Sequence, residues 1–171
     1  HLASSAASDV YKRQAELKDA GVMVRLAYQA MQDLGIDTGE VFRRANMNAD
    51  SLYDSQLRTP HWAQSVFWRV AESVSNDANI GLHIGEKIPL SKGHLLDHLF
   101  NSAANYGDGL RRMIKYQRLL SDAFTARLVE QGEEAFLGFS YKNCHLQHLI
   151  DCTLIATSRT LLANSLSLIH I

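Results

Sequence analysis

The sequence predicts an α+β fold that is predominantly helical, in which several short helices precede a β-hairpin and a long apolar helix. Apolar residues recur every three or four positions over most of the chain, which is the period of an amphipathic helix. The period changes to two between residues 124 and 141, and such alternation predicts strands. Because two strands alone make a thin sheet, we expect the sheet to be truncated.

Four helices are predicted in the first half of the chain, covering residues 22–34, 39–45, 60–75 and about 77–88. The first carries an apolar stripe at helical spacing. Asp37 or Thr38 can cap the second helix. Thr59 followed by Pro60 is typical of a helix start, so the third helix is predicted to begin at Pro60. Its inward residues are predicted to be Val66, Phe67, Val70 and Val74.

The fourth helix contains Gly81 and Gly85 one turn apart, so a neighbouring segment can approach its backbone closely. A short helix over 94–102 follows. Asn105 with Asp108 three positions later is typical of a capped helix start. The last predicted helix covers residues 144–163, and its apolar side is assigned to Leu146, Leu149, Ile150, Thr153, Leu154 and Leu161.

A hairpin is predicted between the last two helices. Apolar residues alternate with other residues in two runs, and residues 131–134 join these runs. The residues assigned to one face are Phe124, Ala126, Leu128, Ala135, Leu137, Phe139 and Tyr141.

Both ends of the chain are expected to come from a sequencing adapter and not from the gene. Ser4 to Gln14 reads as one orientation of a transposase adapter in translation, and Leu166 to Ile171 reads as the other. We therefore divide the chain into a tail over 1–14, one domain over 15–165 that is incomplete at its C-terminus, and a second tail over 166–171.

The charge balance argues against direct nucleic-acid binding by this chain. Its formal net charge is -1 at pH 7, and the basic residues occur in small groups among acids. A DNA-reading domain normally has a clustered basic face. No run of residues approaches the roughly 20 apolar positions that cross a bilayer. Cys144 and Cys152 are too far apart to pair within one helix, and reduced thiols suit a cytoplasmic protein.

Three segments resemble the N-terminal effector-sensing domain, of the arabinose-binding type, in AraC-type bacterial transcription regulators. They are L-R-T-P at 57–60, D-A-N-I-G-L-H-I-G-E at 77–86, and G-H-L-L-D-H-L-F-N-S-A-A-N-Y-G-D-G-L-R-R-M-I-K-Y at 93–116. Their order and spacing extend the resemblance over roughly Val22 to Asn164. Ala78-Asn79 and Asp97-His98 depart from the residues that the family commonly has there.

The resemblance implies a ligand-sensing and dimerisation domain of a regulator whose helix-turn-helix domain lies beyond Asn164. The implied partners are an unknown small-molecule effector, DNA through that missing domain alone, and a second copy in a homodimer. No cofactor, membrane contact or enzymatic activity is implied. We expect the genomic sequence downstream of Asn164 to encode a helix-turn-helix region in the same reading frame.

Four residues are assigned to an effector site. Aromatic residues of the hairpin, with Tyr116 of the preceding helix, can enclose an apolar cavity that has few polar anchors. The candidates are His98, Tyr116, Arg127 and Phe139, and Arg127 is the candidate partner for an anionic effector. The alternative for these aromatic residues is that they fill the core.

Two other classes of function remain open from the residues alone. Cys144, His148 and Cys152 recur every four positions and have zinc-ligand chemistry, so a small metal-binding or redox protein is the main alternative. Three ligands spread over two helical turns reach one ion with difficulty.

His94, Asp97 and His98 form a second polar group, for which a solvated helix face is the alternative. A small enzyme is the third reading, but no nucleophile motif supports it.

Overall fold

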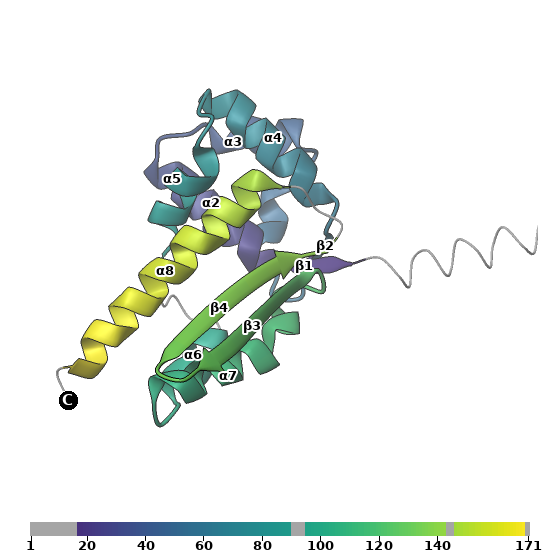
Figure 1. The fold of residues 1–171 in the computed structure, drawn as a ribbon. Coiled ribbons are helices and arrows are strands. Elements are labelled where there is room, and N and C mark those ends of the chain that lie inside the picture. Colours follow the sequence, from purple (N-terminus) through teal and green to yellow (C-terminus); the bar gives the residue numbers. More distant parts are fainter. Residues whose placement is uncertain (1–16, 90–94, 143–145, 170–171) are drawn as a thin grey trace, which may run out of the picture.

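The computed structural model describes residues 17–89, 95–142 and 146–169, with side chains described as far as residue 163. It confirms a predominantly helical α+β fold (Figure 1). The elements in chain order are β1 (Lys18–Ala20), α2 (Gly21–Asp33), α3 (Thr38–Arg44), η1 (Ala49–Tyr53), β2 (Arg58–Pro60), α4 (Ala63–Ser75), α5 (Ile80–Lys87), α6 (Leu95–Asn101), α7 (Tyr106–Lys115), η2 (Gln117–Leu119), β3 (Phe124–Gln131), β4 (Glu134–Tyr141) and α8 (Gln147–Ile169).

Helices α2 to α5 form one group, and their apolar faces make the main core. The largest fully buried side chains are Met31, Val41, Ile80 and Ile84. Helix α8 packs against α5 and runs beside the hairpin, while α7 packs against β3 (Figure 1). The hairpin therefore lies between α8 and the pair formed by α6 and α7.

The predicted hairpin is confirmed. Strands β3 and β4 pair antiparallel, with Phe124 opposite Tyr141 and Gln131 opposite Glu134. Gly132 occupies the turn with a φ of 64°, a left-handed conformation that glycine adopts without steric cost. Because strand side chains alternate between faces, the predicted apolar set shares one face of the hairpin.

A second small sheet was not predicted. Strand β1 pairs antiparallel with β2, so that Asp19 lies opposite Thr59. Asp19 also forms a bridge with Ser121, just before β3. The amide of Asp122 donates to the carbonyl of Lys18 at 2.9 Å, so β1 joins two segments that are far apart in the sequence.

The predicted helix start at Thr59 and Pro60 is wrong, because both residues belong to β2 and α4 begins at Ala63. The backbone of this segment pairs with strand β1, which is distant in the sequence, and local capping signals do not reveal such a partner. Of the four residues predicted to face inward, Phe67 is buried, whereas Val66, Val70 and Val74 are half-buried.

The predicted inward face of the last helix is partly wrong. Leu149 is 3% exposed, but Ile150 and Leu154 are 44% and 50% exposed. This helix is apolar on most sides, so periodicity alone does not select the face that meets α5. The helix is described from Gln147, and its predicted start at Cys144 lies outside the described residues.

Membrane insertion finds no support among the described helices. None of them, α8 included, combines the length and the apolar character that crossing a bilayer requires.

The predicted caps at Asp37 and Asn105 are confirmed. The carboxylate of Asp37 accepts from the amide of Glu40 at 2.9 Å, and the side-chain oxygen of Asn105 accepts from the amide of Asp108 at 2.9 Å. Each bond satisfies an amide at a helix start that has no partner within the helix.

Replacing Asn105 by alanine is expected to lower the free energy of unfolding by about 1 kcal/mol, because α7 loses this cap. Urea denaturation measures the change. Asn101→Ala is the matched control, since Asn101 is exposed at the end of α6, and its effect should stay within about 0.5 kcal/mol. Equal losses in the two variants would contradict a capping role for Asn105.

Candidate ligand-binding cavity

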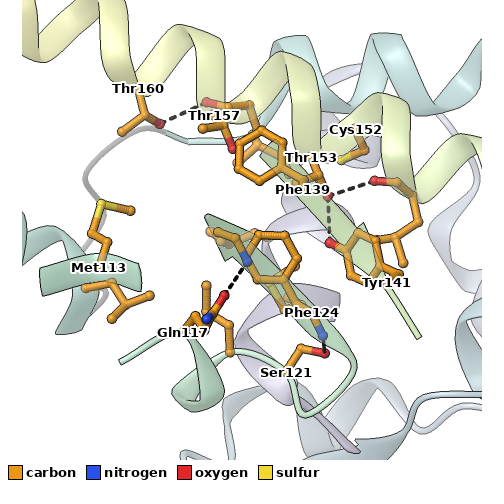
Figure 2. A pocket seen from close by; sticks show the side chains of 18 of the residues that line it. Met113, Gln117, Ser121, Phe124, Phe139, Tyr141, Cys152, Thr153, Thr157 and Thr160 are labelled. Atoms are coloured by element: carbon orange, nitrogen blue, oxygen red, sulfur yellow. Dashed lines mark hydrogen bonds between the residues drawn. The ribbon is translucent and has the colours of Figure 1, made fainter. Parts of the chain in front are cut away.

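A largely apolar cavity of about 220 Å³ lies between one face of the hairpin and helices α2, α4, α7 and α8. Its volume is slightly below the roughly 300–1,000 Å³ typical of small-molecule sites. Figure 2 shows Met113 and Thr160 toward one end and Ser121 and Tyr141 toward the other. The cavity therefore joins the hairpin to the helical part of the fold.

The hairpin wall consists of aromatic and small apolar side chains. Phe124 and Phe139 stack with ring centroids 5.8 Å apart, and Tyr141 lies 5.2 Å from Phe124. Ala126 occupies the position opposite Phe139, where its small side chain leaves open volume. Strand alternation directs these four side chains into the cavity.

Helix α8 supplies the opposite wall through residues at helical spacing. The Thr153 hydroxyl donates to the carbonyl of Leu149 at 2.8 Å and therefore accepts the 2.8 Å bond from the Tyr141 hydroxyl. The Thr160 hydroxyl donates to the carbonyl of Ala156 at 2.9 Å. The Thr157 hydroxyl also lines the cavity, but it forms no hydrogen bond within the described part of the chain.

Cys152 lines the same wall as a protonated thiol. Burial raises its pKa to about 12, and the nearby carboxylate of Asp151 acts in the same direction. At neutral pH the thiol is therefore a small apolar group. A buried thiol of this kind is neither an active nucleophile nor a ready metal ligand.

Gln117 places an amide at the cavity between its two ends (Figure 2). Its side-chain oxygen accepts from the amide of Ala126 at 2.5 Å, which fixes the direction of the side chain. The NH₂ group of Gln117 has no hydrogen-bond partner among the described residues. It is therefore a donor that a ligand can use.

A buried polar network adjoins the end of the cavity near Tyr141. Asp19 accepts hydrogen bonds from His61 Nδ1 at 2.9 Å, Gln64 Nε2 at 3.0 Å and Ser121 Oγ at 2.6 Å. Asp19 and His61 are 2% and 5% exposed. The His61 ring stacks on Tyr141 with centroids 6.0 Å apart, and its Nε2 has no hydrogen-bond partner among the described residues. Gln64 and Ser121 connect the network to the cavity, because both also line it.

The network keeps Asp19 ionised. Burial opposes ionisation and is the largest single influence, but the hydrogen bonds from His61, Ser121 and Gln64 together lower the pKa of Asp19 below its ordinary value. The carboxylate is therefore held by its donors. Sequence reasoning missed this network because nothing local relates Asp19 to partners at positions 61 and 121.

The structure brings only one of the four predicted site residues into the cavity. Phe139 lines it, whereas His98 is exposed on α6 and Arg127 is exposed on β3. Tyr116 is 41% exposed just after α7, with the Lys115 ammonium 5.3 Å from its ring centroid. The lining groups missed by sequence reasoning include Thr157, which was not distinguished from surface residues.

The proposed Cys and His metal cluster is only partly within the described residues. Cys144 and His94 lie outside them. His148 Nε2 is 3.0 Å from a carboxylate oxygen of Glu72, while Cys152 faces the cavity. Within the described ranges, no group of three or more His, Cys, Asp or Glu side chains is arranged to hold a metal ion.

Apolar cavities with a few convergent polar groups are typical of small-molecule-binding sites. The chain belongs to the family described as the arabinose-binding domain of AraC transcription regulator, N-term, whose profile matches residues 35–168. This match confirms the resemblance noted from the sequence and makes the chain an AraC-type sensing domain in transcription regulation. The family description names a ligand-binding domain of a transcription regulator, which points to a ligand-sensing role. A search of curated proteins gave no significant match.

Proposed function

We propose that the chain is the effector-sensing part of an AraC-type regulator, and that the cavity between the hairpin and α8 holds the effector. A helix-turn-helix domain further along the same polypeptide would contact DNA, and two sensing domains would associate as a dimer. The observation that carries this proposal is a cavity of about 220 Å³ with mostly apolar walls, in a chain of a ligand-sensing family.

The position of the cavity suggests how an occupant acts. One wall is the hairpin, another is α8, and Tyr141 and Thr153 already join the two by a hydrogen bond. A ligand that touches both walls stabilises one arrangement of them. Such a ligand shifts the population of that arrangement only to the extent that it binds this arrangement more tightly than any other.

The metal or redox alternative is not favoured. A thiol with a pKa raised to about 12 is a poor ligand and a poor redox centre at neutral pH. The Nε2 atom of His148 lies beside Glu72 instead of beside a cysteine.

Filling the cavity is expected to abolish effector response. Ala156 lines the cavity on α8, so Ala156→Leu in the complete regulator places extra carbon atoms where the effector would lie. We expect the ratio of promoter activity with and without the inducing condition to fall at least about tenfold. A tenfold fall corresponds to a loss of about 1.4 kcal/mol in the free energy of effector binding. A promoter-reporter assay measures this ratio.

Ala135→Leu is the matched control, because Ala135 is exposed near the hairpin turn. It introduces the same side chain but should leave the response unchanged. Circular dichroism of both proteins checks that they fold. If folded Ala156→Leu responds normally, the effector does not use this cavity.

A further inference from the structure

The charges around the cavity restrict what can bind there. Among the described residues that line it, Asp97 is the only one with a charged side chain at neutral pH, because Cys152 is protonated and no lysine, arginine or histidine contributes. No hydrogen bond or ion pair of the described residues involves the Asp97 carboxylate, which lines the cavity from α6. Among the described lining residues an anionic ligand would find no cation, and the Asp97 carboxylate would repel it. Leaving a buried charge unpaired carries a large desolvation cost.

Few polar groups remain for a ligand. Gln64, Ser121, Thr153 and Thr160 use their side chains in hydrogen bonds within the protein. The Thr157 hydroxyl, the Gln117 NH₂ group and the Asp97 carboxylate remain. A free pentose has hydroxyl groups all around its ring, and most of them would face apolar walls. Each buried hydroxyl without a partner weakens binding substantially.

We propose that the ligand of this cavity is a mostly hydrocarbon molecule with one small polar head that is neutral or cationic, and that neither a free sugar nor a carboxylate is the ligand. This inference rests on the proposed effector site. The apolar body would lie between Phe124, Phe139 and the α8 wall seen in Figure 2. The head would bond to the Thr157 hydroxyl, with the Gln117 NH₂ group and the Asp97 carboxylate as the other polar groups of the lining that could reach it.

Trp68 provides a direct readout of binding. It lines the cavity and is 3% exposed, whereas the second tryptophan of the chain, Trp62, is 64% exposed. Trp62→Phe therefore leaves Trp68 as the only tryptophan. Titrations of this protein would use octanol, octylamine and octanoate, which share a tail length and differ in the charge of the head, together with L-arabinose.

We expect octanol and octylamine to change Trp68 emission with saturation, and octanoate to bind at least about tenfold more weakly. L-arabinose should give no change. Thr157→Val keeps the shape of the side chain and removes its hydroxyl, so it should weaken octanol binding about fivefold, the effect of one hydrogen bond. Ser158→Ala is the matched control on the exposed side of α8 and should leave binding unchanged.

The proposal is overturned if L-arabinose or octanoate binds as tightly as octanol, or if none of the four compounds affects Trp68. These outcomes concern the chemistry of the ligand. The effector-site proposal is tested separately by Ala156→Leu, because loss of the promoter response in that variant supports the site whatever its ligand is.

Discussion

Alanine in place of Gly81 is expected to lower the free energy of unfolding by roughly 2–3 kcal/mol, the usual cost of forcing atoms into a packed interface. A Cβ at Gly81 would clash with the carbonyl oxygen of His148 and lie 2.5 Å from its Cα. Both are backbone atoms of α8, so no side-chain rotation relieves the clash. Helices α5 and α8 would have to separate, and the cavity wall on α8 would move with them.

Urea denaturation measures this loss, and Gly39→Ala is the control. Gly39 is also helical, but the nearest atom to a Cβ there is an Asp37 carboxylate oxygen at 3.4 Å. That substitution should leave stability unchanged or raise it by up to about 1 kcal/mol, because alanine favours the helix. Similar destabilisation of both variants would show that the close approach of α5 and α8 is not the cause.

The second large effect is expected at Asp19. Asp19→Ala should lower the free energy of unfolding by about 4 kcal/mol, because it removes the acceptor from a buried ionic network. His61, Gln64 and Ser121 would each lose a partner in an interior where water does not replace it. Asp122→Ala is the control, since its ion pair with Arg58 is partly exposed and should contribute at most about 1 kcal/mol.

The contribution of Asp19 to the free energy of unfolding is also expected to depend on pH. The folded-state pKa of Asp19 is lowered, so its stabilisation is complete above the unfolded pKa of about 3.9 and is lost as pH falls through the folded pKa. Urea unfolding at about pH 6 and in acid, for the unsubstituted chain and for Asp19→Asn, measures this loss. The difference between the two proteins should shrink in acid, and a constant difference would contradict the ionised state of Asp19.

The helices and the hairpin were predictable because their signals are local. Periodicity, turn residues and caps such as Asp37 and Asn105 report the conformation of adjacent residues. Strand β2 was not predictable in this way, since its partner β1 lies about 40 positions earlier. The exposed position of Leu154 likewise depends on which side of an apolar helix meets α5.

The cavity was predictable only from the hairpin side. Alternation places Phe139 on the face that it occupies, but it gives no information about the direction of Tyr116 after the end of a helix. Helix α8 carries a second local signal. Thr153, Thr157 and Thr160 recur on one side of an otherwise apolar helix, where polar residues next to apolar ones can mark a lining.

Strand β1 also bears on how the chain folds. Asp19 and Ser121 are 102 positions apart, and their contact closes a loop that contains most of the molecule. Local helices and the hairpin can form within microseconds, whereas contacts of long sequence separation slow folding. We therefore expect the docking of β1 to be the rate-limiting step of refolding. Helical ellipticity should reach a near-native value before the amides of β1 become protected from hydrogen exchange.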